Sequence, residues 1–240
     1  MSSTDPHQFG DADVPIELLR ERAFNLRWAM QPEDVIPLTA ADVDFPCAPV
    51  IREAISEYAL SGVFSYGPPE GLPEFRRACA HMLRSRHATN ADPEHCLAVN
   101  SAAKGMSIVA RTVLGPGDEA IIFDPVDFLF AHSIESAGAT AVRVPIDPST
   151  GTFDLDAVRA AITPRTRMIA LCNPHNPVGV SFTRAELEGI AEIALEHELW
   201  LMSDEIWSDI VFDRSTHVAT ASLSAEIAAR TFTVHGFVRV

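Results

Sequence analysis

Short apolar runs alternate with amphipathic helical patterns over most of the chain. Six runs of four residues predict β-strands, and the segments between them repeat apolar positions at helical spacing. Because the runs are largely unbroken, each strand is expected to be covered on both faces. This strand–helix–strand order predicts a mostly parallel sheet with right-handed crossovers. The six runs are residues 96–99, 120–123, 141–144, 168–171, 199–202 and 231–234.

Helical patterns precede and separate these strands. Upstream, apolar residues share one helical face from Ala48 to Gly62 and again from Leu72 to Leu83. Thr183 and Glu186 have the spacing of a capping box, which predicts the start of a helix running to about His197. Further helices are predicted at 102–114, 128–137, 155–162 and 224–230, whereas residues 1–45 look irregular apart from a helical patch near 16–30.

Composition and charge narrow the class of protein. The 240 residues are 47% hydrophobic and 21% charged, which is ordinary for a globular protein and predicts one large domain, or one plus a fragment. A formal net charge of −15 argues against nucleic acid and anionic membranes as partners. The N-terminus lacks the apolar core of a secretory signal, and no apolar run approaches a membrane span.

Cysteine and histidine spacing carries no metal or disulfide pattern. No two of the four cysteines are spaced as CxxC, which predicts reduced thiols in a cytoplasmic protein. The sequence motifs of dinucleotide-binding, P-loop, serine-hydrolase and zinc-protease enzymes are absent, so an unrelated α/β enzyme is poorly supported.

Polar or small residues follow the predicted strands, at the point where each strand ends. Ligands of open parallel sheets bind beyond the carboxyl ends of the strands, so these segments are the candidate site. They are Asn100–Gly105, Asp124–Asp127, Cys172–Gly179, Ser203–Trp207 and His235–Phe237.

Two of these segments carry a specific resemblance. The run Asn173-Pro-His-Asn-Pro-Val-Gly179, followed at the next strand end by Ser203-Asp-Glu-Ile206, resembles the class I/II aminotransferases, which are pyridoxal-phosphate enzymes of fold type I. With Ala41-Asp-Val-Asp-Phe-Pro46 and Tyr66-Gly-Pro-Pro-Glu-Gly71, the chain is similar to the cystathionine β-lyase-like, cysteine-conjugate C–S lyase branch. The resemblance extends from about Asp42 to Phe237.

The resemblance implies a fold, a cofactor and partners. Residues 46–240 are expected to form the three-layer α/β large domain that binds pyridoxal 5'-phosphate, incomplete at its C-terminus. Residues 1–45 are expected to form an N-terminal arm and part of the small domain, whose C-terminal remainder is missing. The family also implies an amino-acid substrate and, for the full-length protein, a homodimer.

Three groups of residues match the family's cofactor site. Asp204 matches the carboxylate that keeps the cofactor ring nitrogen protonated, which the electron-sink chemistry requires. Asn176 matches the donor to the ring phenolate. Ser101, Ala102 and Ala103 stand at a helix start, where backbone N–H groups bind phosphate, and Lys104 follows them. Other interpretations stay open: a helix N-cap for Asp204 and Ser101, an Asn-Pro turn for Asn176, and a solvated lysine for Lys104.

Three further positions bear on the reaction type. Asp127 stands where many members place an aromatic that stacks on the cofactor ring. Trp207 stands where many place a tyrosine or histidine beside the phenolate, and an indole donates only one hydrogen bond and accepts none. Tyr66 resembles the tyrosine that reaches the phosphate of the partner subunit, although a loop-packing role is an equal alternative.

The catalytic lysine of the family has no match. The family reads Gly-Phe-Ser-Lys where this chain reads Gly236-Phe-Val-Arg239, and the lysine there bonds covalently to the cofactor. Arg239 takes that position, and the only lysine of the sequence is Lys104. A guanidinium stays protonated and cannot replace the amine. We therefore expect a truncated chain that is inactive by itself; the alternative is a non-catalytic fragment, or a partner subunit, that binds the cofactor weakly or not at all.

Overall fold

The computed structural model describes residues 14–39, 42–212 and 216–236. The chain divides into two compact units, with the boundary between Tyr66 and Gly67. The expected domain boundary after residue 45 refers to the complete fold of the family and stays a prediction.

In its described residues, 14–39 and 42–66, the first unit has two α-helices and one 3₁₀ turn, α1 (Ile16–Arg22), η2 (Trp28–Met30) and α2 (Pro49–Leu60). Its polar anchor is the buried Arg27, which donates to the carbonyl oxygens of Pro37 (3.1 Å) and Thr39 (2.8 Å) and pairs with Asp44 at 2.5 Å. The helix predicted from Ala48 is confirmed as α2, and no residue of α2 is buried.

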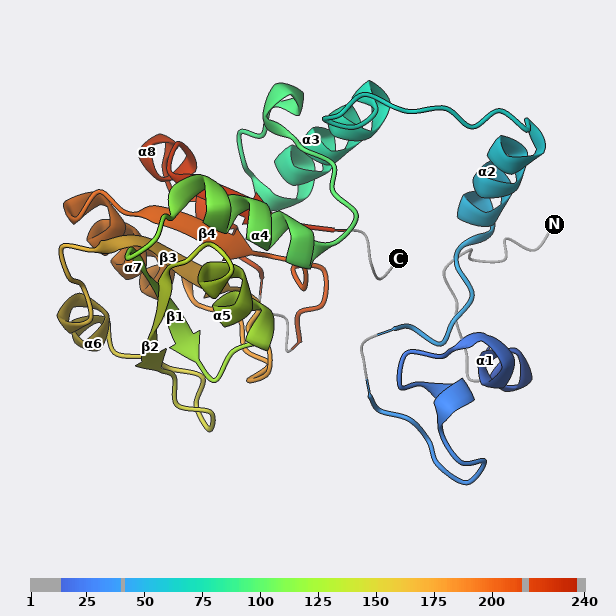
Figure 1. Cartoon of the computed structure of the whole chain (residues 1–240), viewed down its shortest axis with the longest axis horizontal. Helices are drawn as coiled ribbons and strands as arrows, with labels where there is room; N and C mark the ends of the chain where they lie inside the picture. Colours follow the sequence, from blue (N-terminus) through green and yellow to red (C-terminus); the bar gives the residue numbers. More distant parts are fainter. Residues whose placement is uncertain (1–13, 40–41, 213–215, 237–240) are drawn as a thin grey trace. The chain divides into compact units, whose positions relative to one another are not determined.

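The second unit is built on five parallel strands, shown in Figure 1. They are β1 (Glu119–Asp124), β2 (Thr140–Pro145), β3 (Thr166–Cys172), β4 (Trp200–Asp204) and β5 (Thr231–Val234), in the order β2-β1-β3-β4-β5. The predicted mostly parallel sheet is therefore confirmed.

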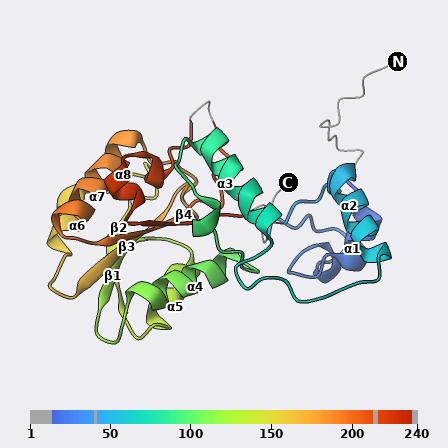
Figure 2. The same cartoon turned by 90° about the horizontal axis from the view of Figure 1, so that it is seen from above.

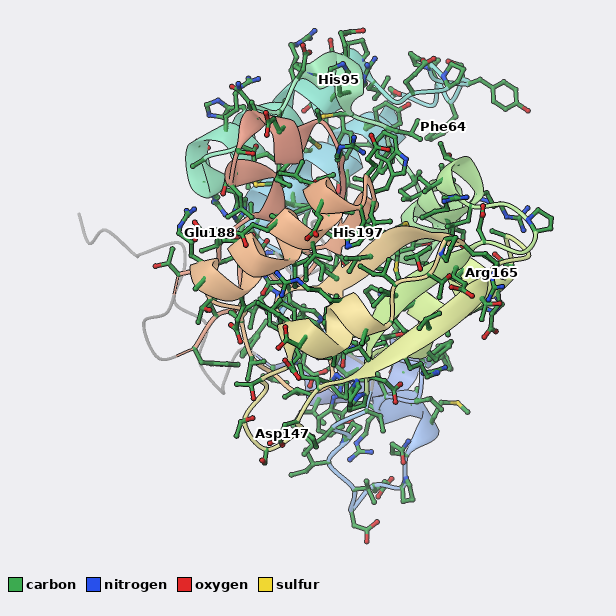
Figure 3. The ribbon with its side chains drawn as sticks, turned by 90° about the vertical axis from the view of Figure 1, so that its left-hand side faces the viewer. Phe64, His95, Asp147, Arg165, Glu188 and His197 are labelled. Atoms are coloured by element: carbon green, nitrogen blue, oxygen red, sulfur yellow. The ribbon has the colours of Figure 1, made fainter. Side chains whose placement is uncertain are left out.

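The two ends of the sheet can be located by two residues labelled in Figure 3. Arg165 directly precedes the start of β3 and Asp147 follows the end of β2, and the two lie well apart in that view.

Helices cover both faces of the sheet, which gives the expected three layers. One face is packed by α4 (Ala102–Val113) and α5 (Phe128–Glu135), and the other by α6 (Leu155–Ala160), α7 (Arg184–Glu196) and α8 (Ala225–Ala228), as Figure 2 shows. Successive residues of each strand point to opposite faces of the sheet, so alternate residues pack in the apolar cores on its two sides. Ile122, Ala170 and Met202 face the α4/α5 side, whereas Ile121, Ile169 and Leu201 face the α7 side.

Side-chain caps mark the first residues of several helices of the second unit. Thr183 Oγ1 accepts from the Glu186 amide (3.2 Å) while Glu186 accepts from the Thr183 amide (2.7 Å), so the predicted capping box is confirmed. At the start of α4, Ser101 Oγ accepts from the Lys104 amide, and at the start of α5, Asp127 Oδ1 accepts from the Leu129 amide. Within the described residues, no helix combines the length and the apolar character needed to cross a membrane.

One predicted strand is wrong. Residues 96–99 join no strand of the sheet; they follow the 3₁₀ turn η3 (Pro93–His95), which itself follows α3 (Pro73–His87). The Ala98 amide instead donates to Glu70 O at 2.9 Å, and Leu97 and Val99 stay largely exposed. A strand needs a neighbouring strand to complete its ladder, and the described residues offer this segment none.

Candidate cofactor site

The site lies at the carboxyl ends of three neighbouring strands. The strands β1, β3 and β4 end at Asp124, Cys172 and Asp204, and Cys172 lies directly opposite Asp204 in the parallel register. The segment after β3 is tied to β4, because the Asn173 amide donates to Asp204 O at 2.9 Å. The loops that follow these strands are therefore held side by side.

Asp127 and Asn176 join the loop after β1 to the loop after β3. The Asp127 amide donates to Asn176 O (3.2 Å), and Asn176 Nδ2 donates to Asp127 Oδ2 (3.1 Å). The other carboxylate oxygen, Oδ1, accepts from the Leu129 amide at 3.0 Å and begins α5. The predicted site residues Asp127 and Asn176 are thus brought into direct contact.

Asp204 is a buried carboxyl group on the α4/α5 side of the sheet. It lies two residues beyond Met202 on the same strand, so both side chains leave the same face. Its Oδ1 accepts from the Ile206 amide at 3.1 Å. Burial is the main cause that raises the pKa of Asp204 to about 6; the charges of Asp127 and Glu205 contribute to this rise, and the hydrogen bond from the Ile206 amide opposes it. Asp127 and Asp204 therefore lie close enough to interact electrostatically.

Cys172 packs between these groups as an inert thiol. It is 2% exposed, accepts weakly from the Asn176 amide (3.4 Å) and donates to Pro174 O (3.4 Å). Burial, together with the charge of Asp204, raises the pKa of the thiol far above its ordinary range. A neutral buried thiol is neither a nucleophile nor a metal ligand, so Cys172 supports the site only by packing.

The start of α4 lies against the same face of the sheet. Ala102 packs on the apolar cluster that includes Cys172 and Val234, and a Cβ at Gly105 would lie 3.5 Å from Val234. Ser101 O and Oγ accept from the amides of Gly105 (3.1 Å) and Lys104 (3.2 Å). Among the described residues, no acceptor is found for the first-turn N–H groups of Ala102 and Ala103, and a helix start favours negative charge.

The remaining candidates are less closely tied to the site. Trp207 is half-buried in the turn after β4, three residues beyond Asp204. Lys104 is exposed on the first turn of α4. Tyr66 is fully exposed and ends the first unit of the chain. Arg239, which takes the position of the family's lysine, lies outside the described residues.

A second polar cluster, which the sequence pattern did not predict, lies on the opposite face of the sheet. Glu205 is 0% exposed and accepts from Ser203 Oγ (2.9 Å), from the Thr220 amide (3.0 Å) and from His217 Nε2 at 3.1 Å. The only sequence signal was that Glu205 directly follows Asp204, so strand alternation would point it to the other face.

Three imidazoles crowd beside that carboxylate. The rings of His87 and His217 are 5.4 Å apart, those of His87 and His235 are 5.7 Å apart, and His235 Nε2 lies 2.9 Å from Ser208 Oγ. Over the part of the chain that the structure describes, no group of three such residues has metal-binding geometry. The His175 imidazole, in the loop after β3, is buried separately, which lowers its pKa to about 4.

Comparison with known proteins agrees with this geometry. A family model described as aminotransferase class I and II matches residues 33–237. The chain is 36% identical over 207 residues to the arginine–pyruvate transaminase of Pseudomonas aeruginosa, with 85% of this chain and 52% of that protein covered. It is 30% identical over 198 residues to the cystathionine β-lyase of Bacillus subtilis, with 81% and 51% covered.

A solved structure shows the same fold. The aromatic aminotransferase of Pyrococcus horikoshii superimposes with a TM-score of 0.82 at 31% identity, with 87% of this chain and 56% of that chain covered. The chain therefore spans about half the length of the relatives it matches. From the family model, which matches most of the chain, and from this shared fold, we conclude that the chain belongs to the class I and II aminotransferases.

Proposed function

We propose that this chain holds pyridoxal 5'-phosphate at the carboxyl ends of β1, β3 and β4. The observation that carries the proposal is the buried Asp204, whose raised pKa means that its charge is poorly compensated by the protein alone. A cationic ring nitrogen beside it would supply the missing positive charge. The hydrogen-bond donors around the site are the side-chain amide of Asn176 and the backbone N–H groups in the first turn of α4. Such donors suit an anionic ligand that carries several oxygen atoms.

The residues present fit the cofactor group by group. Asp204 would hold the proton at the ring nitrogen, and Asn176 would donate to the phenolate oxygen. The N–H groups of Ala102 and Ala103, with Ser101 and Lys104 beside them, would bind the phosphate. When bound, the cofactor supplies an electron sink for bonds at the α-carbon of an amino acid.

We propose that the complete protein uses this site for transamination or for β-elimination at a carbon–sulfur bond. The relatives include a transaminase and a cystathionine β-lyase, so both reactions have support. Trp207 carries no hydroxyl group, unlike a tyrosine at the same position. A homodimer, with Tyr66 reaching the phosphate of the partner subunit, is the arrangement that the family implies, and a cytoplasmic location is consistent with the four free cysteines.

The 240-residue chain by itself is proposed to bind the cofactor without a covalent bond and without turnover. Its one lysine, Lys104, belongs to the phosphate end of the site, and Arg239 cannot form the bond. The second candidate is a non-catalytic fragment that binds the cofactor weakly or not at all.

Borohydride reduction tests whether a covalent bond forms, and equilibrium dialysis separates the two candidates. The chain is mixed with pyridoxal phosphate, reduced and mapped by peptide mass, and non-covalent binding is measured by equilibrium dialysis. We expect dialysable binding, weakened in Asp204→Ala and unchanged in Asp156→Ala on the exposed first turn of α6. Stoichiometric label at Lys104 together with amino-acid-dependent turnover would contradict the proposal, and wild-type binding no tighter than that of Asp204→Ala would favour the second candidate.

A further inference from the structure

We propose that Asp127 is a positioning residue that fixes the orientation of the Asn176 amide, so that its nitrogen, and not its oxygen, is presented as the donor in the site. This inference rests on the proposed function and goes beyond it, because Asp127 takes a position at which an aromatic ring is common. An acid there cannot stack on a ring, so it acts in another way.

Each of the two carboxylate oxygens of Asp127 accepts one hydrogen bond. Oδ1 accepts from the Leu129 amide at 3.0 Å as the cap of α5, and Oδ2 accepts from Asn176 Nδ2 at 3.1 Å. A carboxylate accepts and does not donate. If the Asn176 amide were rotated by half a turn, its oxygen would face Oδ2 and two acceptors would oppose each other. Asp127 therefore permits one amide orientation.

The backbone of Asn176 is held as firmly as its side chain. Its carbonyl oxygen accepts from the Asp127 amide (3.2 Å), and its own amide donates to Cys172 Sγ (3.4 Å). Pro177 follows and limits rotation on the other side. Asn176 is thereby joined to β3 through Cys172 and to α5 through Asp127. Its side-chain amide is therefore held in position before any ligand binds.

One hydrogen of the Asn176 nitrogen remains after this bond is made. A side-chain amide nitrogen carries two N–H groups, and Asp127 takes one of them. The second N–H points to a direction that Asp127 fixes, and it can donate to an oxygen of the bound ligand. The phenolate oxygen of the proposed cofactor is the group that such a donor would stabilise in its ionised form.

The substitution Asp127→Asn provides a sharp test because an asparagine side chain has only one acceptor oxygen. If that oxygen keeps the cap on Leu129, the nitrogen of the substituted side chain faces Asn176, and the Asn176 amide must turn its oxygen toward it. Asp127→Ser keeps a good helix cap but reaches Asn176 poorly, so it serves as a second variant that preserves α5. The control is Asp154→Asn, because Asp154 caps α6 through Asp156 (2.9 Å) and belongs to another helix.

The first readout needs no cofactor. The chain has five asparagines, so ¹⁵N-asparagine labelling reports five side-chain amides, and Asn176 is identified by its loss in Asn176→Ser. Asp127→Asn adds a sixth side-chain amide, which is recognised because Asp127→Ser lacks it. We expect Asp127→Asn and Asp127→Ser to shift the Asn176 side-chain signal, and Asp154→Asn to leave it in place. An unchanged Asn176 signal in both Asp127 variants would overturn the proposal.

The second readout is the ionisation of bound pyridoxal phosphate. Absorbance of the bound cofactor is followed against pH, and its dissociation constant is measured by dialysis. We expect both Asp127 variants to weaken binding about threefold to tenfold and to require higher pH for phenolate formation. Absence of wild-type binding would refute the proposed function, while the amide signals would still decide the role of Asp127. Binding with wild-type phenolate ionisation in both variants would overturn the positioning role alone.

Discussion

Asp204 and Glu205 are neighbours in sequence whose carboxyl groups lie on opposite faces of the sheet. Asp204 faces the α4/α5 side, where the Ile206 amide donates to it, whereas Glu205 accepts from Ser203, Thr220 and His217 on the other side. The two acids differ in what surrounds them. Glu205 has a complete set of protein donors, while Asp204 is buried with few, and this contrast underlies the first two predictions.

Asp204→Asn should stabilise the cofactor-free chain at neutral pH. Burial raises the pKa of Asp204 to about 6, so the folded chain takes up its proton at a higher pH than the unfolded chain, whose carboxyl has a pKa of about 3.9. Stability from this group therefore rises as the pH falls from above 6 toward 4, and the ionised form costs up to about 3 kcal/mol at pH 7. Urea unfolding at pH 7.5 and at pH 4 measures the difference.

The Asp204→Asn gain should be present at pH 7.5 and absent at pH 4. Asp156→Asn is the control, because Asp156 is exposed on α6. A lower urea midpoint for Asp204→Asn at pH 7.5 would show that the buried charge is better compensated than the structure indicates.

Glu205→Ala should destabilise the chain by about 3 kcal/mol or more. The change leaves the Ser203 hydroxyl, the Thr220 amide and His217 without their shared acceptor in a buried site. Glu205→Gln should cost less, since one oxygen can still accept from Ser203 and Thr220. Denaturant unfolding compares both variants with Glu188→Ala on the outer side of α7, where Figure 3 shows Glu188. Equal stability of Glu205→Ala and Glu188→Ala would refute the network.

The histidine cluster beside Glu205 should make the fold acid-sensitive. Burial lowers the pKa of His87 and of His235, and the neighbouring imidazoles lower both further, although Glu205 and Asp209 oppose this and Arg86 adds to it at His87. Below about pH 6.5 the unfolded chain binds more protons at these positions than the folded chain. The free energy of unfolding therefore decreases as the pH is lowered. The expected loss begins below the ordinary histidine pKa and continues through the lowered values.

Replacing one imidazole should flatten this loss. His87→Phe keeps an aromatic ring next to His217 and His235 but removes a titrating group, so its unfolding midpoint should fall less between pH 7 and pH 5. His197→Phe, exposed at the end of α7, is the control (Figure 3). Both are best measured in an Asp204→Asn background, because Asp204 acts in the opposite direction over the same pH range. An identical slope in the two variants would contradict the prediction.

Gly71→Ala should destabilise the second unit through two separate effects. Gly71 has φ of +103°, a conformation that side chains rarely adopt, and a Cβ there would lie 2.5 Å from Ala98 Cβ. Strain of the backbone alone costs about 1–3 kcal/mol. Gly117→Ala isolates that part, since Gly117 has φ of +88° and no atom within 4 Å of the added Cβ. Thermal unfolding should show a larger loss for Gly71→Ala than for Gly117→Ala, and equal losses would rule out the contact with Ala98.

The parallel sheet could be predicted from sequence because local signals and tertiary environment agree there. In β1 and β3, the side chains that belong to the two apolar clusters alternate along an unbroken apolar run. The helix α7 begins with a capping box. The segment 96–99 has the same local signal, but a strand also requires a partner in space. Its backbone pairs with Glu70 instead, and apolar composition alone does not report that.

The candidate site likewise has some features that could be predicted from the sequence and others that could not. Asp204 and Asn176 could be singled out because each follows a buried strand, and the order of strands brings them to one edge. The bond between Asp127 and Asn176 could not, since the two residues lie 49 positions apart and their pairing depends on the neighbouring placement of β1 and β3. His87 likewise reaches His217 and His235 from a distant helix, which no local pattern encodes.

The placement of two carboxyl groups, Asp127 and Asp204, in one site of an acidic chain has a consequence for how fast an anionic ligand is captured. Pyridoxal phosphate carries a negatively charged phosphate, and the chain carries a formal charge of −15, so approach is opposed by the field of the protein. Dissolved salt weakens that field beyond about 10 Å at 0.1 M. Capture should therefore become faster as ionic strength rises, the reverse of the behaviour of sites that attract their ligands electrostatically.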